Sequence, residues 1–225
     1  MAETTGPLIS VRGEAAAEVE PELAHVVVTV VARDRDRDRV LRDLDERARS
    51  VDALLDRFST AIERVDTEAV RVAPQFATNK PREKVAGYEA SVRRTVVLHE
   101  FSPLGDLLAQ LAVIDLAAVT GPTWTLRPAS EVTRDVRVAA VRDAVHRAQE
   151  YAEALGCSLT ELVDLADVGL MTSPEARAMA VSGVAATAFR GAPAPETFSF
   201  DVTPTRQVVE ASVEARFRAT PPDLS

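Results

Sequence analysis

Two kinds of hydrophobic spacing alternate along the chain. Alternation at every second position, typical of a strand with one buried face, is clearest in residues 85–98 and 208–219. Spacing of three and four, typical of an amphipathic helix, runs from Leu41 to Ile62 through Leu44, Ala48, Val51, Leu55 and Phe58. The pattern predicts that strands and helices follow one another throughout the sequence.

Five further strands are predicted from β-branched runs bounded by turn residues, at 8–13, 22–33, 69–78, 117–127 and 159–169. We expect 69–78 and 85–98 to pair as an antiparallel hairpin. Pro74 lacks an N–H, which favours an edge or a bulge at that position. The connection 14–21 is short enough to tighten 8–13 and 22–33 into another hairpin.

Three helices are predicted. The first covers about six turns from Leu41 to Ile62 and packs one face on a sheet, with a coiled coil as the alternative. The second opens at Ser102-Pro103. The third spans 130–155 and ends at Gly156, and its small residues allow close approach to a sheet: Val136, Ala140, Ala144, Ala148 and Ala152.

The predicted order is β-β-α-β-β-α-β-α-β-β. This order indicates an α+β fold in which helices pack on one side of a largely antiparallel sheet. With 225 residues, we expect a single domain over 7–218 and tails at 1–6 and 219–225. Residues 171–197 are rich in Ala, Pro and Gly, and we interpret them either as a surface loop or as an interface arm with Phe189, Phe198 and Phe200 nearby.

Charges alternate strictly from Arg33 to Arg39. On a strand this places all the arginines on one face, whereas on a helix like charges meet at i,i+4. We interpret the segment as a solvated strand end that runs into a helix. A binding role for the arginine face is the alternative.

Composition excludes several classes of protein. A hydrophobic share of 46% with 27% charged residues excludes a disordered chain. A net charge of −9 and only 4% aromatic residues disfavour nucleic-acid binding. No apolar run approaches the ~20 residues that span a bilayer. The N-terminal residues lack the features of a signal peptide, so we expect a cytoplasmic protein, or an exported one if a signal has been removed.

No catalytic, cofactor-binding or metal-binding constellation emerges. Nucleotide-binding glycine loops and nucleophile elbows are absent from the sequence. The histidines His25, His99 and His146 fall on separate predicted elements, so they show no ligand spacing. Cys157 is the single cysteine, and we interpret it as a small buried hydrophobe, with a reactive thiol as the alternative.

An ordered set of segments resembles the SIMPL-domain family, formerly a domain of unknown function. The segments are Ile9 to Glu14, Val19 to Ala24, Val85 to Ala90 with its Gly-Tyr, the alanine-rich 139–156 ending in Leu-Gly, and the last strand 208–219. Glu22 stands where the family usually has Asp, and Pro204-Thr205 replaces its usual Pro-Gly. The resemblance covers roughly 7–218.

The resemblance implies an α+β fold and, as in some bacterial relatives, ring- or channel-like homo-oligomers. Relatives include envelope antigens, stress-defence proteins and a signalling adaptor, and the family offers no agreed catalytic residues. We therefore expect a non-enzymatic, self-associating protein with a stress-related, scaffold or adaptor role, without a cofactor and with a possible protein partner. The alternative is a small-molecule-binding or enzymatic domain that uses a cleft between sheet and helices.

Overall fold

The computed structural model describes residues 6–76, 85–168 and 200–222 and confirms the predicted α+β fold and element order. The elements are β1 (Leu8–Val19), β2 (Leu23–Asp34), α1 (Arg37–Asp56), β3 (Ile62–Phe76), β4 (Val85–Leu98), α2 (Leu104–Ala112), β5 (Ala117–Thr125), α3 (Glu131–Ala154), β6 (Leu159–Asp167) and β7 (Gln207–Ala219). The strands form two sheets, in the orders β1-β7-β6 and β3-β4-β2-β5.

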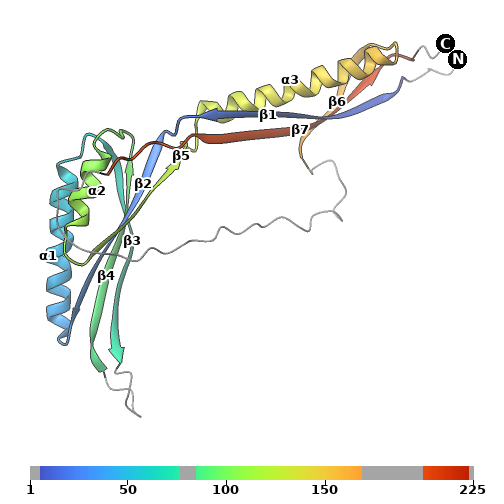
Figure 1. Cartoon of the computed structure of the whole chain (residues 1–225). Helices are drawn as coiled ribbons and strands as arrows, with labels where there is room; N and C mark the ends of the chain where they lie inside the picture. Colours follow the sequence, from blue (N-terminus) through green and yellow to red (C-terminus); the bar gives the residue numbers. More distant parts are fainter. Residues whose placement is uncertain (1–5, 77–84, 169–199, 223–225) are drawn as a thin grey trace. The chain divides into compact units, whose positions relative to one another are not determined.

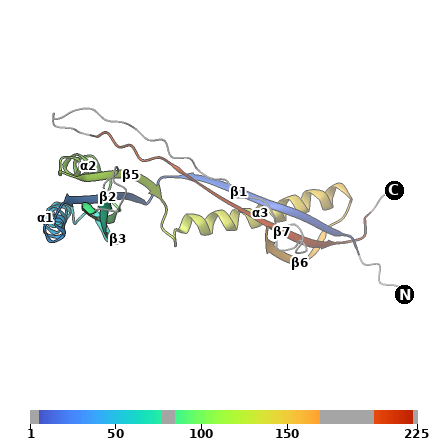
Figure 2. The same ribbon diagram turned by 90° about the horizontal axis from the view of Figure 1, so that it is seen from below.

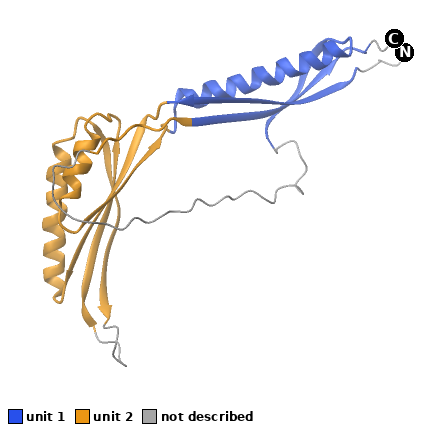
Figure 3. Ribbon diagram, in the orientation of Figure 1, with its two compact units in different colours: residues 1–19, 128–191, 208–225 blue, residues 20–127, 192–207 orange. Residues whose placement is uncertain are grey.

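Two compact units each contain one of these sheets (Figure 3). Unit 1 comprises 1–19, 128–191 and 208–225, and unit 2 comprises 20–127 and 192–207. A single domain over 7–218 stays a prediction. The segment 171–197, with Phe189, and also Phe198 lie outside the described residues.

In unit 2, helices α1 and α2 lie on one face of the four-stranded sheet (Figures 1 and 2). We call this the helix-side face. Alternation explains the arrangement, because every second residue of the central strands β2 and β4 points into the core between sheet and helices. The core members from these two strands are Ala24, Val26, Val28, Val30, Ala32, Ala90, Val92, Val96 and Leu98.

Asp36 starts α1. Its side chain accepts a hydrogen bond from the backbone N–H of Arg39 at 2.9 Å, which satisfies one of the free donors at the helix start. Asp34, the last residue of β2, accepts from the N–H of Asp36 at 2.9 Å. Arg33 contacts Glu89 of β4 at 2.6 Å. The interpretation of the alternating charges as a strand end running into a helix is confirmed.

The predicted helix end at Ile62 is wrong. Helix α1 ends at Asp56, and the chain turns through i→i+3 hydrogen bonds at 57–61 before Ile62 opens β3 opposite Leu98. The spacing continued past the helix because Phe58 and Ile62 pack on the same core as the helix. The prediction that Leu41 belongs to the buried stripe of this helix is also wrong, because Leu41 is exposed and its neighbour Val40 is buried.

In unit 1, α3 lies along one face of the three-stranded sheet (Figures 1 and 2). All five small residues of the predicted stripe are buried: Val136, Ala140, Ala144, Ala148 and Ala152. A repeat of four drifts around a helix of 3.6 residues per turn, so the contact line winds across the helix surface. The four alanines of the stripe pack on Ile9, Val11, Val213, Ala215 and Phe217 from the strands.

The expected hairpin between the first two strands is wrong, because β1 and β2 belong to different sheets. Strand β1 continues beyond the predicted 8–13 to Val19. It runs antiparallel to β7, where the N–H of Ala219 donates to the carbonyl of Pro7 at 3.0 Å and Arg12 contacts Glu214 at 3.3 Å. The alternation of β1 persists through its alanines, and Ala15 packs on the core beneath α3.

Candidate functional site

Strand β3 forms an edge of the unit 2 sheet and leaves a row of valines exposed. Val65, Val70 and Val72 are 41%, 66% and 37% exposed. They pair with Val96, Val92 and Ala90 of β4, which are core residues on the helix-side face. Helix α1 packs mainly on β2 and β4, so the same face is covered over β4 and open over β3. We call these three residues the β3 valine row.

The opposite face of β3 carries charges. Arg64 binds Asp66 of the same strand at 2.8 Å, and this hydrogen bond and charge raise the pKa of the Arg64 guanidinium. Glu68 contacts Arg93 of β4 at 2.9 Å and also accepts from the hydroxyl of Thr95. Arg71 has no ion pair with any residue that the structure describes. The strand therefore has one apolar face and one charged face.

A bulge interrupts β3 at Glu68. Thr67 pairs with Arg94 and Ala69 with Arg93, which leaves Glu68 as the extra residue. Before the bulge the helix-side residues carry odd numbers (Val65 and Thr67), and after it they carry even numbers (Val70 and Val72). The bulge keeps the valines on one face despite the change in numbering.

Phe200, one of the three predicted interface residues, is described and is 45% exposed. It lies beside α2, where its carbonyl oxygen would be 2.4 Å from a Cβ atom on Gly105. A hollow of about 440 Å³ opens there, lined mainly by apolar residues of α2, β5 and the segment 200–202, among them Leu108, Val119 and Pro122. Phe200 therefore forms part of an apolar recess in unit 2.

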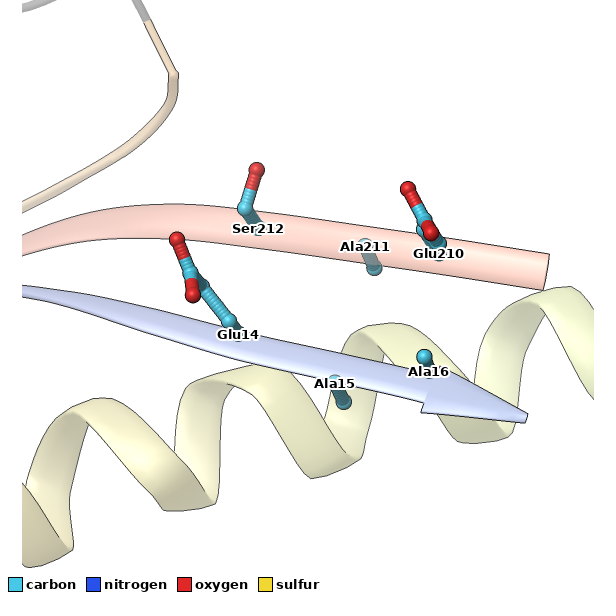
Figure 4. A pocket seen from close by; sticks show the side chains of 6 residues that line it. All are labelled: Glu14, Ala15, Ala16, Glu210, Ala211 and Ser212. Carbon is cyan, nitrogen blue, oxygen red and sulfur yellow. The ribbon is translucent and has the colours of Figure 1, made fainter.

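A second hollow, of about 620 Å³, lies on unit 1 between β1 and β7 (Figure 4). Glu14, Glu210 and Ser212 point away from α3 there, whereas Ala15 and Ala211 point toward it. The backbone N–H of Glu14 donates to Asp143 of α3 at 2.9 Å, which ties the strand to the helix. Two carboxylates and a hydroxyl could bind a cation or a hydrogen-bond donor. Within the described ranges, no three His, Cys, Asp or Glu side chains gather as metal ligands would.

The structure keeps the three histidines apart. The His25 Nε2 lies 2.9 Å from the Thr125 hydroxyl, across the β2–β5 pair. His146 lies 3.3 Å from Glu150, one turn along α3, and His99 follows β4. Cys157 is buried in the unit 1 core with its Sγ 3.6 Å from the Leu155 carbonyl, as expected of a small hydrophobe.

Sequence reasoning missed the β3 valine row as a surface feature. Pro74 was the signal, because it indicated an edge or a bulge, and β3 is an edge strand. The sequence did not indicate which strands the helices leave uncovered. In the part of the chain that the structure describes, none of the helices combines the length and the apolar character needed to cross a membrane.

Comparison with known protein families identifies a family to which nearly the whole chain is similar. A family model named SIMPL and described as "Protein of unknown function (DUF541)" matches residues 9–217, nearly the whole chain. No curated protein matches the sequence.

Proposed function

The chain belongs to the SIMPL family, and we propose that it acts as a non-enzymatic protein that associates with copies of itself, in a scaffold, adaptor or stress-related role. The observation that carries this proposal is the β3 valine row. It combines exposed apolar side chains with a sheet edge, whose outer N–H and C=O groups are free to pair with another strand.

Soluble proteins usually protect such an edge. Charged side chains, a proline or a bulge on the edge, a short strand or a covering loop are the common means. Strand β3 has 15 residues, and the charges among its residues 64–73 lie on the face opposite the valines or at the bulge. The bulge at Glu68 and Pro74 restrict how another strand can pair with β3, and the exposed valine row between 65 and 72 remains suited to contact with another chain.

Light scattering on the purified protein tests this proposal. We expect a mass that is a multiple of 24.2 kDa at micromolar concentration and that falls on dilution. A variant lacking residues 171–197 distinguishes the interface arm expected from the sequence from the β3 valine row. If the variant still self-associates, the arm is not required, because the variant retains β3. A monomer at every concentration, with a mass of 24.2 kDa for the full chain and correspondingly less for the shortened variant, would overturn self-association.

The second candidate function is the binding of a small apolar molecule in the Phe200 hollow. The recess between α2 and β5 has the apolar lining that ligand pockets usually show. Fluorescence of an apolar dye tests it, with Phe200→Ala and Leu108→Ala as variants that enlarge the recess. We expect both variants to change dye binding, and unchanged binding in both would exclude this site.

A further inference from the structure

We propose that two copies of the chain pair through β3, edge to edge and antiparallel, with Val65 of one copy opposite Val72 of the other and Asp66 opposite Arg71. This inference rests on the proposed self-association and specifies its surface and register. It joins two four-stranded sheets into one continuous sheet, with the helix-side faces of both copies on the same side.

One edge of β3 is paired with β4, and the other edge is free. Side-chain direction and N–H direction both alternate along a strand, so all helix-side residues of β3 direct their N–H groups toward the same edge. Pro74 belongs to this helix-side set, since it pairs with Tyr88. A proline fits in a ladder only where an N–H would point away from the neighbouring strand. Val65, Thr67, Val70 and Val72 therefore direct their N–H and C=O groups outward, ready for a second strand.

The bulge at Glu68 restricts the register in which two β3 strands can pair. In a continuous sheet, opposite residues must share a face. Because helix-side residues are odd-numbered before the bulge and even-numbered after it, the first half of one β3 matches the second half of another only when odd numbers meet even numbers. For two β3 strands that pair along their whole length, the bulge therefore excludes every register in which odd-numbered residues lie opposite odd-numbered residues.

Three of the remaining registers differ in the residues that they place opposite each other. One of them, which places Val65 opposite Val70, also places Arg64 opposite Arg71, and these like charges repel. Shifting the other way places Val65 opposite Pro74, which offers no N–H. The register between these two places Val65 opposite Val72, Thr67 opposite Val70 and Asp66 opposite Arg71. It avoids the Arg64–Arg71 repulsion of the first register and the Val65–Pro74 pair of the second, and it places Asp66 opposite Arg71.

Symmetry strengthens this arrangement. The two copies are related by a two-fold axis that passes near Glu68 and Ala69, so each favourable pair occurs twice. Arg71, which has no ion pair within its own copy among the described residues, gains Asp66 of the second copy. We choose a second copy as the occupant, over an unrelated strand, because the complementary residues are those of β3 itself.

Cysteine pairs test the register directly. In the variant Val65→Cys/Val72→Cys, the two cysteines of different copies lie opposite each other, at the ~5 Å Cα separation that a disulfide needs. Within one copy they are seven residues apart on one strand, about 23 Å, so they cannot join. The matched control Val65→Cys/Val70→Cys places its cysteines diagonally, at about 7–8 Å, beyond the usual reach.

We expect mild oxidation to convert the Val65→Cys/Val72→Cys variant into a covalent dimer on a non-reducing gel, at least about tenfold more than the control. Equal yields from both pairs would overturn the register. An oligomer in light scattering whose Val65→Cys/Val72→Cys variant stays uncrosslinked would overturn pairing through β3 and leave self-association intact. A monomer at all concentrations would overturn both.

A charge reversal gives a second readout that does not depend on oxidation. Arg71→Asp places two carboxylates opposite each other at each charge pair, and we expect dimer affinity to fall roughly fivefold or more at low salt and to recover partly at high salt. The control Arg42→Asp makes the same charge change on an exposed position of α1. An equal loss for both variants would show an effect of net charge alone and would overturn the Asp66–Arg71 pairing.

Discussion

Gly13 of β1 lies directly against Ala144 of α3. A Cβ atom on Gly13 would come within 2.6 Å of the Ala144 Cβ and 2.1 Å of the carbonyl oxygen of Ala140. Both distances are far below van der Waals contact, so the helix backbone rests on the strand where the strand has no side chain. The close packing of α3 on β1 therefore requires both the small alanines of the helix and the glycine of the strand.

Replacement of Gly13 by alanine should therefore destabilise unit 1. The added methyl meets helix backbone, which cannot move aside as a flexible side chain could, and we expect a loss of about 2 kcal/mol or more in the free energy of unfolding. Urea denaturation followed by circular dichroism measures it. Ala16→Ser, on the open face of the same strand, is the control and should change stability by less than about 0.5 kcal/mol. Equal effects would contradict the close contact.

Arg94 places a charge on the helix-side face of β4, between Val92 and Val96. Its side chain is 15% exposed and forms an ion pair with Asp52 of α1. Asp52→Asn removes the negative partner of a largely buried guanidinium, and we expect a loss of about 1–2 kcal/mol in unfolding free energy. The control Asp45→Asn breaks an exposed pair with Arg49 on the same helix and should cost about 0.5 kcal/mol or less. Thermal and urea unfolding of both variants would reveal the difference, and a reversed order would contradict the burial of Arg94.

Asp34 should make the start of α1 sensitive to acid. The hydrogen bond from the N–H of Asp36, together with the charge of Arg39, lowers the pKa of the Asp34 carboxyl below its ordinary value. A lowered folded-state pKa contributes stability above the unfolded value of about 3.9, and this contribution is lost as the pH falls through the folded value.

We therefore expect wild type to be more stable than Asp34→Asn near neutral pH, and the difference to close on acidification below about pH 4. Unfolding at a series of pH values measures the difference, and NMR titration of the Asp34 carboxyl gives its pKa directly. A difference that widens with acid would have the wrong sign for this interaction.

A proline pair tests which residues of β3 face outward. Val70→Pro removes an N–H that points away from β4, whereas Arg71→Pro removes one that bonds to β4. We expect Arg71→Pro to cost at least about 1 kcal/mol more than Val70→Pro, since it leaves a ladder acceptor on β4 without its donor. Urea unfolding of the two variants decides the question, and the opposite order would refute the assignment of the free edge.

Several features of the fold followed from local pattern. The alternation of β7, the alternation of β4 as far as Val96, the alanines at every fourth position of α3 and the end of α3 at Gly156 each depend on neighbours in sequence, and the structure confirms them. At the end of β4 the alternation fails, because Val97 is buried as well as Val96 and Leu98. The alternation of β4 also placed Arg94 on the same face as Val92 and Val96. The predicted end of α1 was wrong because Phe58 and Ile62 pack on the same core as the helix. The spacing of hydrophobic residues indicates which side chains are buried, but it does not indicate where the helical backbone hydrogen bonds end.

By itself, the sequence determined which faces of each element are apolar, since side-chain period and solvent exposure act residue by residue. Only the tertiary structure decided how the strands divide into two sheets and which apolar faces the helices cover, because strand pairing joins residues far apart in the chain. Val70 and Val92 illustrate the difference. Both are strand valines on the same face of one sheet, yet Val92 is buried on a central strand and Val70 is exposed on the edge, where α1 does not reach.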